Sequence, residues 1–365
     1  MNALGEKIAR LLAANGPISI AEYMAIALQD PEHGYYTTRD PFGASGDFIT
    51  APEVSQMFGE LIGLWMVQAW RDQGSPAPCR LVELGPGRGT LMADALRAAK
   101  LDPQFLASIE VVLIESSPVL RDVQKTTLAN FGKPIRWLDR FDESLSDKPL
   151  FLIANEFFDA LSIRQFIMAE RGWCERLIGL DTSGALTFGL SPQPSALAIP
   201  SDRGLPDLGA VYEVSPAAEA LVEQIAHAIA VEGGAALIVD YGYGDGAGFG
   251  DTLQAVSRHN YASILDAPGE ADLTAHVDFA GLGRAAECAG AKAYGPVEQG
   301  EFLCRLGIVD RAQRLAMANR RGSRGLGKQP ELKRQLDRLI LPGQMGTLFK
   351  ALAIVHRAAP TPAGF

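Results

Sequence analysis

The sequence predicts a Rossmann-like α/β protein with a mostly parallel sheet, a helical N-terminal region and an inserted antiparallel β unit. Short apolar runs alternate with amphipathic segments over residues 79–153, and the alternation returns over residues 215–242. Strands separated by helices of this length need crossover connections, which produce parallel sheets. The stretch between these two regions has strand-like runs without helices, which indicates an insertion.

The expected elements follow one another along the chain. Residues 1–75 have helical periodicity, interrupted by the loop HGYYTTRDPFGASGDFITAPE. The core then comprises strand CRLVELG, helix TLMADALRAAK, strand IEVVLIE, helix SPVLRDVQKTTLANF and strands PIRWL and PLFLI. The runs IRQFIM, GWCERLIGL and ALTFGL predict the β unit over residues 162–210. The helix SPAAEALVEQIAHAIAV and the strand GAALIVDYG restore the pattern, helices are expected over much of 276–342, and GTLFKALAIVHR is the last strand. The α/β core, with helical additions, would therefore comprise residues 76–161 and 211–365.

Composition limits the classes of function. The 365 residues carry a formal net charge of -10, which argues against binding to a nucleic-acid backbone and is compatible with a basic protein partner. The four cysteines are scattered without a CxxC pair, so neither a metal site nor a disulfide framework is expected. No apolar run reaches the roughly 18–20 residues of a membrane span. The scattered cysteines favour a reducing compartment, and the N-terminal stretch has no continuous apolar segment typical of a signal peptide.

The segment LVELGPGRGT is the most informative local pattern. A strand ends at Gly85, and Gly87 and Gly89 follow before a helix, so a ligand can approach the backbone closely. The dinucleotide fingerprint GxGxxG fails because its third position is Thr90. The GxGxG pattern, with Glu83 two residues before it, resembles the S-adenosylmethionine loop of class I methyltransferases more than a nicotinamide or flavin site.

A carboxylate after the second strand supports this interpretation. Glu115 ends the strand IEVVLIE, at the place where an acid binds the ribose hydroxyls of a nucleoside. Asn155, after the strand PLFLI, lies at the same expected edge of the sheet and joins Glu83, Glu115 and the glycines as a predicted cofactor-binding residue.

The segment ANEFFDAL places two acids and two aromatic rings at a strand end. Glu156 and Asp159 are three residues apart, so one helical turn would put both on one face, where they could hold a guanidinium. One of them could also accept its proton. Phe157 and Phe158 could wall the pocket. Alternatively, Asn155 or Glu156 caps a helix and both rings belong to the core.

The segment TAHVDF offers a second pair of candidate catalytic residues. Asp278 could orient His276 and form a proton relay with it. The alternative is a helix N-terminus with Thr274 as its cap. The glycine-containing stretch over residues 43–53 is a candidate lid, although Glu53 alone could simply favour a first helical turn.

Seven segments in order resemble the MidA-like protein arginine methyltransferases, whose mitochondrial members assist assembly of respiratory complex I. They are GPISIAEYMAIAL, HGYYTTRDPFGASGDFITAPEVSQMFGE, LVELGPGRGTLMADALRA, IANEFFDALSIRQF, YEVSP, VDYGYG and ADLTAHVDF. The resemblance implies a class I methyltransferase core, S-adenosylmethionine, and symmetric dimethylation of an arginine on a complex I core subunit. It also implies that the 43–53 stretch folds over the cofactor. Ser162 stands where this family is expected to have proline.

Two other functions stay open: a non-catalytic assembly chaperone and a small-molecule methyltransferase. The β insertion and the N-terminal loop are expected to grip a protein partner, which favours a large substrate. The family's mitochondrial presequence is not recognisable, which leads us to expect a bacterial cytoplasmic protein.

Overall fold

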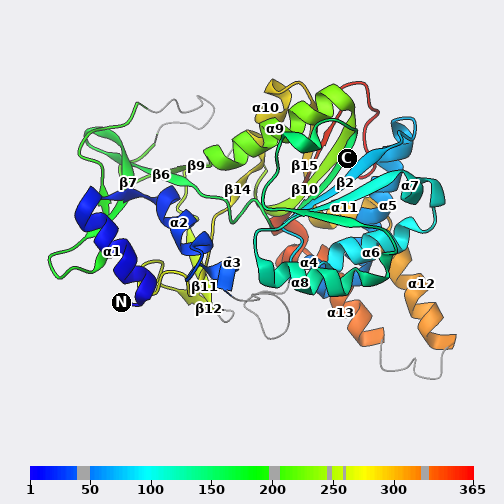
Figure 1. Ribbon diagram of the computed structural model, residues 1–365, viewed down its shortest axis with the longest axis horizontal. Helices are drawn as coiled ribbons and strands as arrows, with labels where there is room; N and C mark the ends of the chain where they lie inside the picture. The colour runs from blue at the N-terminus through cyan, green and yellow to red at the C-terminus, as the bar shows by residue number, and fades with distance from the viewer. Residues whose placement is uncertain (39–49, 197–205, 245–248, 258–259, 322–328) are drawn as a thin grey trace.

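The fold is built around one mixed sheet, seen in a computed structural model that describes residues 1–38, 50–196, 206–244, 249–257, 260–321 and 329–365 (Figure 1). The strand order is β15-β16-β10-β5-β2-β3-β4, and β14 (Val277–Asp278) pairs with the end of β10. Its long strands are β2 (Cys79–Leu84), β3 (Ile109–Ile114), β4 (Ile135–Leu138), β5 (Leu150–Asn155), β10 (Gly234–Tyr243), β15 (Lys292–Glu298) and β16 (Phe349–Val355). Only β16 is antiparallel to its neighbours, and the other six strands are therefore parallel to one another.

Helices cover both faces of this sheet (Figure 1). Since side chains alternate along each strand, Leu81 and Ile153 face one apolar cluster while Val82 and Leu152 face the other. The first cluster includes residues of α5 (Gln56–Asp72), α6 (Thr90–Ala99), α7 (Pro103–Ser108), α11 (Gln299–Arg305), α12 (Ile308–Arg321) and α13 (Gln329–Ile340). The second includes residues of α9 (Pro216–Glu232) and α10 (Phe279–Cys288). A further helix, α8 (Pro118–Thr127), connects β3 to β4.

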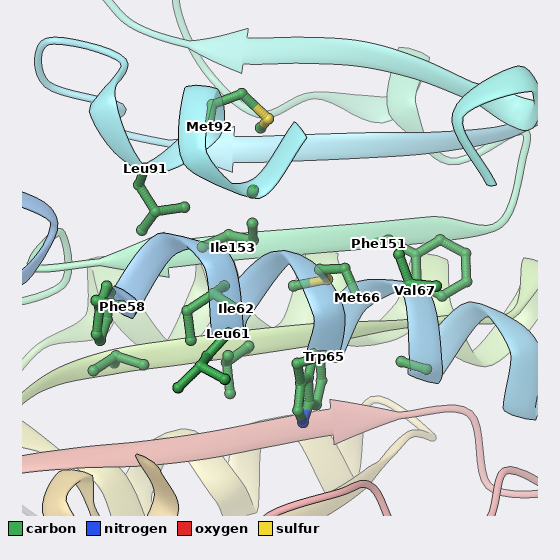
Figure 2. Packing of buried hydrophobic residues seen from close by; sticks show 14 of the residues in the cluster. Phe58, Leu61, Ile62, Trp65, Met66, Val67, Leu91, Met92, Phe151 and Ile153 are labelled. Atoms are coloured by element: carbon green, nitrogen blue, oxygen red, sulfur yellow. The ribbon is translucent and has the colours of Figure 1, made fainter. Parts of the chain in front are cut away.

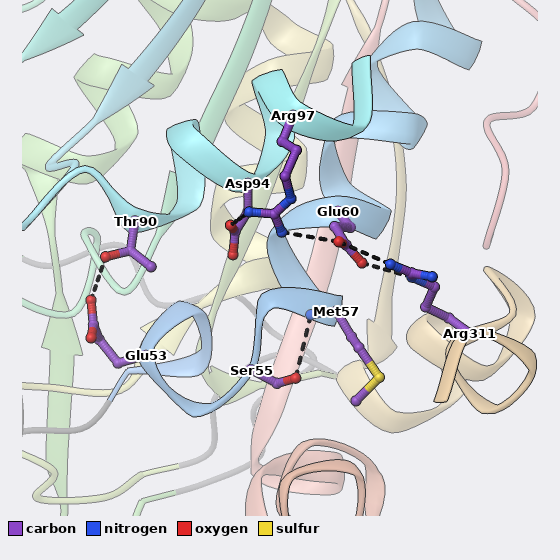
Figure 3. Close-up of polar contacts among 8 residues, drawn as sticks. All are labelled: Glu53, Ser55, Met57, Glu60, Thr90, Asp94, Arg97 and Arg311. Atoms are coloured by element: carbon purple, nitrogen blue, oxygen red, sulfur yellow. Dashed lines mark hydrogen bonds and ion pairs between the residues drawn. The ribbon is translucent and has the colours of Figure 1, made fainter. Parts of the chain in front are cut away.

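Helix α5 is the most extensively buried helix of the first layer. Figure 2 shows its apolar side chains packing with those of α6 onto Phe151 and Ile153 of β5. Complete burial of each such side chain stabilises the fold by about 1.5–3 kcal/mol. One buried acid of α5, Glu60, accepts hydrogen bonds from Arg97 of α6 at 2.9 Å and from Arg311 of α12 at 2.7 Å (Figure 3). This ion-pair network attaches the C-terminal helices to the core.

A second lobe lies beside the sheet, at the left of Figure 1. It combines segments that are far apart in the sequence around one apolar cluster that includes Leu4, Tyr23, Ile178 and Leu273. Its helices are α1 (Ala3–Asn15), α2 (Ile20–Gln29) and α3 (Tyr35–Thr38), and its strands are β1 (Ile18–Ser19), β6 (Arg164–Ala169), β7 (Gly172–Leu180), β8 (Leu186–Leu190), β9 (Val211–Val214), β11 (Gln254–Ser257), β12 (Asn260–Ala262) and β13 (Asp272–Thr274). Strands β1 and β6–β9 form one antiparallel sheet, and β11–β13 form another.

The predicted core strands are confirmed, as is the α/β class. The antiparallel sheet is wider than the expected 162–210 unit, because β1 and β9 belong to it. The expectation of helices over much of 276–342 missed β15. This strand contains the dipeptide Gly295-Pro296, which usually ends regular structure, and here it occupies the sheet edge at a register shift between Tyr294 and Val297.

Candidate active site

The site lies where the strand order of the sheet reverses. The chain proceeds from β2 to β3 and β4 on one side and then returns to β5 on the other side of β2, and ligands bind at the carboxyl ends of strands at such a point. A cavity of about 420 Å³ lies at this edge. It is lined by Gly85 after β2, Glu115 after β3 and Glu156 after β5, and by Leu28 and Tyr36 of the second lobe. Both lobes therefore contribute to the site.

The glycine loop has the backbone geometry that only glycine adopts without strain. Gly85, Gly87 and Gly89 have φ values of 57°, 52° and 80°. A Cβ atom at Gly85 would also lie 2.7 Å from Cδ2 of Phe157, too close for an ordinary contact. Gly89 is the N-cap of α6, so the loop directs a helix N-terminus toward the cavity edge.

Glu115 is held in place by hydrogen bonds on both carboxylate oxygens. Its Oε1 accepts from the Ser117 amide at 2.8 Å and its Oε2 from Gln124 Nε2 at 3.1 Å, while burial raises the pKa of the carboxyl. The Gln124 amide also donates to the Gly87 carbonyl at 2.7 Å and accepts from Trp137 Nε1 at 2.8 Å. Gln124 thus ties the glycine loop to the predicted ribose ligand. Sequence reasoning missed it, because a lone glutamine on a helix forms no recognisable pattern.

Glu83 and Asn155 line a smaller cavity of about 40 Å³ beside the glycine loop. Glu83 is 3% exposed, and burial raises its pKa to about 8. Among the described residues, Glu83 Oε2 and Asn155 Oδ1 are buried without a hydrogen-bond partner. Two unpartnered acceptors at one place fit a ligand that donates hydrogen bonds, and an ammonium group has three donors. The amino-acid portion of S-adenosylmethionine supplies such a group.

Helix α4 (Ala51–Val54), from the N-terminal region of the chain, also lines this smaller cavity through Pro52 and Glu53. The Thr90 hydroxyl donates to Glu53 Oε1 at 2.5 Å, which links α4 to the helix that follows the glycine loop (Figure 3). Of the predicted lid over residues 43–53, only residues 50–53 lie within the described ranges. The lid stays a prediction.

Glu156 lines both cavities and has an unusual backbone conformation. Its φ is 51°, a left-handed value that is uncommon and strained for a residue other than glycine. Its Oε1 accepts from the Ala51 amide at 2.9 Å and from Asn155 Nδ2 at 3.1 Å. Burial raises its pKa to about 7, and the nearby charge of Asp159 contributes. A glycine would relieve the strain, so the presence of glutamate points to a need for its carboxyl.

Asp159 lies close to Glu156 but faces another partner. It accepts a hydrogen bond from the Tyr241 hydroxyl at 2.6 Å, and burial raises its pKa to about 6. It is not among the residues that line the 420 Å³ cavity. The two rings between these acids are divided, since Phe157 lines that cavity and Phe158 is buried in the core. The prediction of a pocket wall therefore holds for Phe157, and the alternative of a core residue holds for Phe158.

His276 and Asp278 line a separate cavity of about 50 Å³, which Glu156 does not line. Asp278 Oδ1 accepts from the Gly281 amide at 2.9 Å and caps α10, so a helix does begin here, with Asp278 as its cap in place of Thr274. The His276 ring lies 5.6 Å from the Tyr241 ring, and burial lowers its pKa. Tyr241 contacts both the His276 ring and Asp159, so His276 is separated from Glu156 by these residues. A catalytic role for His276 and Asp278 stays a prediction.

This arrangement defines a class. The parallel sheet with one reversed strand, the glycine loop after β2, Glu115 after β3 and Glu156 after β5 describe a Rossmann-like S-adenosylmethionine-dependent methyltransferase. Residues 61–297 match a family described as "Putative S-adenosyl-L-methionine-dependent methyltransferase". The chain belongs to this family, and S-adenosylmethionine is its cofactor.

Similar proteins agree with this assignment. The mitochondrial protein arginine methyltransferase NDUFAF7 of Danio rerio is 38% identical over 383 residues, covering 96% of this chain and 86% of that protein. The Homo sapiens protein of the same name is 37% identical, with 94% and 81% covered. A Burkholderia thailandensis protein solved with S-adenosyl-homocysteine bound is 29% identical, with a TM-score of 0.85, and the match covers 99% of this chain and 94% of that one.

These relatives correct the expected localisation. The relatives named NDUFAF7 are mitochondrial proteins, which contradicts the expectation of a bacterial cytoplasmic protein. That expectation depended on not recognising a targeting segment, and the start of a sequence is weak evidence for where a protein works. In the described ranges, no helix has both the length and the apolar character needed to cross a membrane.

Proposed function

We propose that this methyltransferase acts on arginine side chains of a protein. The observation that carries the proposal is Glu156, whose carboxyl lies at the junction of the two cavities despite a strained backbone. A buried carboxylate there would bind a guanidinium through two parallel hydrogen bonds and fix its plane. The relatives named NDUFAF7 are protein arginine methyltransferases, which supports the same substrate class.

Different residues would bind the two portions of the cofactor. Gly85, Gly87 and Glu115 would hold the adenosine portion of the cofactor, and Glu83 with Asn155 its amino-acid portion. S-adenosylmethionine supplies an electrophilic methyl group, so the protein's task is mainly to orient the acceptor and manage one proton.

Glu156 is suited to both of these tasks. Its Oε1 is fixed by Ala51 and Asn155, while Oε2 receives no hydrogen bond within the described part of the chain. A pKa of about 7 allows the carboxylate to accept the proton that the methylated guanidinium loses. The negative charge of Asp159 would help to raise the pKa of Glu156. Tyr36 would exclude water from the cavity of about 420 Å³ that it lines.

The finer proposal is symmetric dimethylation of an arginine in a respiratory complex I core subunit. Its support is the ordered resemblance of seven segments to the MidA-like family. The second lobe, which contains the strands of the predicted insertion, would grip the protein partner together with the N-terminal loop, since this lobe meets the cavity through Leu28 and Tyr36. A non-catalytic chaperone fits less well, because it would have no need for a strained glutamate at position 156.

The test compares Glu156→Gln with Glu223→Gln, which changes an exposed acid of α9. Mass spectrometry would measure methylarginine in complex I subunits treated with each variant, and calorimetry would measure S-adenosyl-homocysteine binding. We expect Glu156→Gln to lower the rate by about 10²–10⁴-fold, with product affinity retained, and Glu223→Gln to behave as the parent. Full methylation by Glu156→Gln would contradict the proposal.

A further inference from the structure

Asp240 is a fully buried acid at the carboxyl end of β10, and its carboxylate faces the turn that follows β5. One oxygen, Oδ2, accepts hydrogen bonds from three consecutive backbone amides, those of Phe157 at 3.1 Å, Phe158 at 2.9 Å and Asp159 at 3.2 Å. The other oxygen accepts from the Tyr241 amide at 2.9 Å. The segment VDYGYG gave no indication of this role, because the contact joins residues more than 80 positions apart.

Three consecutive amides converge on one oxygen only where the chain turns sharply. Such a concave set of N–H groups forms a nest for an anion. The turn begins at Glu156, whose amide still donates to the Val239 carbonyl at 2.9 Å, as in the parallel pairing of β5 with β10. The left-handed φ of Glu156 then redirects the next three amides toward Asp240. The nest and the strained residue are therefore parts of one structure.

The position of Asp240 separates it from the ligand-binding surface. It lines neither the cavity of about 420 Å³ nor the cavity of about 40 Å³, whereas Glu156 lines both. Burial, with the neighbouring acids Asp159 and Glu156, raises the pKa of Asp240 well above its usual range, and the backbone amides oppose that rise. The hydrogen bonds from these amides hold the turn in a conformation that Glu156 alone would disfavour.

We propose that Asp240 is a positioning residue that holds the Phe157–Asp159 amides in a nest and thereby keeps Glu156 left-handed, with its carboxyl between the two cavities. The catalytic consequence rests on the proposed role of Glu156. The conformational part is independent of the substrate, and it can be tested in the folded protein without any acceptor.

The first test is a double-mutant cycle on the free energy of unfolding, which separates the backbone strain of residue 156 from its charge. Asp240→Asn is introduced into Glu156→Gly and Glu156→Gln backgrounds, and urea unfolding is measured at pH 7. Both backgrounds lack the charge at position 156, but only glycine adopts the left-handed conformation freely. We expect Asp240→Asn to raise the unfolding equilibrium constant about tenfold less in the glutamine background, because loss of the nest lets the glutamine leave the strained conformation and recover that strain, whereas the glycine has no strain to recover. Equal effects in both backgrounds would overturn the proposal.

The cycle also remains informative if a variant does not fold. If only one of the two double variants folds, the Asp240→Asn single variant decides the question through the second test. If both double variants are unfolded while both Glu156 single variants fold, Asp240 has a general structural role and the proposal fails.

The second test measures Asp240→Asn alone. We expect its kcat for methyl transfer to fall at least about tenfold while its S-adenosyl-homocysteine affinity stays within about threefold of the parent, because the glycine loop and Glu115 are not in contact with it. Parallel loss of both, or a parental kcat, would count against a positioning role. Should Glu156→Gln retain full activity, the proposed function fails, and the stability cycle still decides the role of Asp240.

Discussion

Replacing Glu83 with glutamine should stabilise the protein without ligand and weaken cofactor binding. Burial raises the pKa of Glu83 to about 8, so the folded state retains a proton that the unfolded state releases near pH 4.5. The contribution of Glu83 to the free energy of unfolding is therefore fully present below pH 4.5, and it is lost as the pH rises to about 8. At about 1.4 kcal/mol per tenfold change, the loss at pH 8 reaches about 4 kcal/mol, and at pH 5 it is about 1 kcal/mol or less.

Glutamine reproduces the neutral acid, including its unpartnered polar atom, and it cannot ionise. Urea unfolding at pH 8 should therefore show Glu83→Gln more stable than the parent by up to about 4 kcal/mol, with most of the gain absent at pH 5. Calorimetry should show S-adenosyl-homocysteine bound about 10- to 100-fold more weakly, since a charge-assisted hydrogen bond contributes about 1.5–3 kcal/mol.

The matched control is Glu115→Gln, which changes a carboxylate that already accepts two hydrogen bonds. This variant should lose stability at pH 8, because Glu115 has partners that need an acceptor. The reasoning is refuted if Glu83→Gln is less stable than the parent at pH 8, or if it binds S-adenosyl-homocysteine as tightly as the parent does.

Three further results are expected. Gly85→Ala should lower the free energy of unfolding in urea by at least about 1–2 kcal/mol, because a left-handed alanine costs about that much and its Cβ would meet Phe157; unchanged stability would contradict this. The methyl-transfer rate should fall as the pH drops below about 7, where Glu156 gains a proton, and a flat profile from pH 5 to 8 would exclude it as the base. Gln124→Ala should cost about 1–3 kcal/mol in thermal unfolding, since it leaves Trp137 Nε1 without its acceptor; an unchanged Tm would contradict this.

The core strands and the glycine loop could be predicted because their signals are local. A buried strand is a short apolar run, and a tight turn before a helix needs glycine at fixed positions, as at Gly85 and Gly89. The acids Glu83, Glu115 and Glu156 follow directly from these elements, because parallel strands bring their carboxyl ends to one edge.

The remaining features depend on contacts between distant segments. Gln124 and Asp240 act through backbone groups of the glycine loop and of the turn after β5, and no spacing in the sequence records such a contact. The second lobe is similar, since its core joins α1 and α2 to strands more than 150 residues away. Asp159 shows the limit of helical spacing, because the left-handed Glu156 interrupts the regular turn that would place both acids on one face.

The charge balance of the site suggests why the product should leave. Glu83, Glu156, Asp159 and Asp240 lie at one edge of the sheet, and in the described ranges no basic side chain forms an ion pair with any of them; the charge of Arg338 opposes the rise in the pKa of Glu156. A cationic ligand would add positive charge beside these acids. S-adenosylmethionine carries a sulfonium that S-adenosyl-homocysteine lacks, while both share the ammonium, so their affinity ratio isolates the sulfonium. At pH 8 calorimetry should favour S-adenosylmethionine on the order of tenfold, and the ratio should fall toward pH 6 as Glu156, with a pKa of about 7, gains a proton. Glu156→Gln should show the low ratio at both pH values, and a ratio in the parent that does not change with pH would mean that these carboxylates do not sense the transferring methyl group's charge.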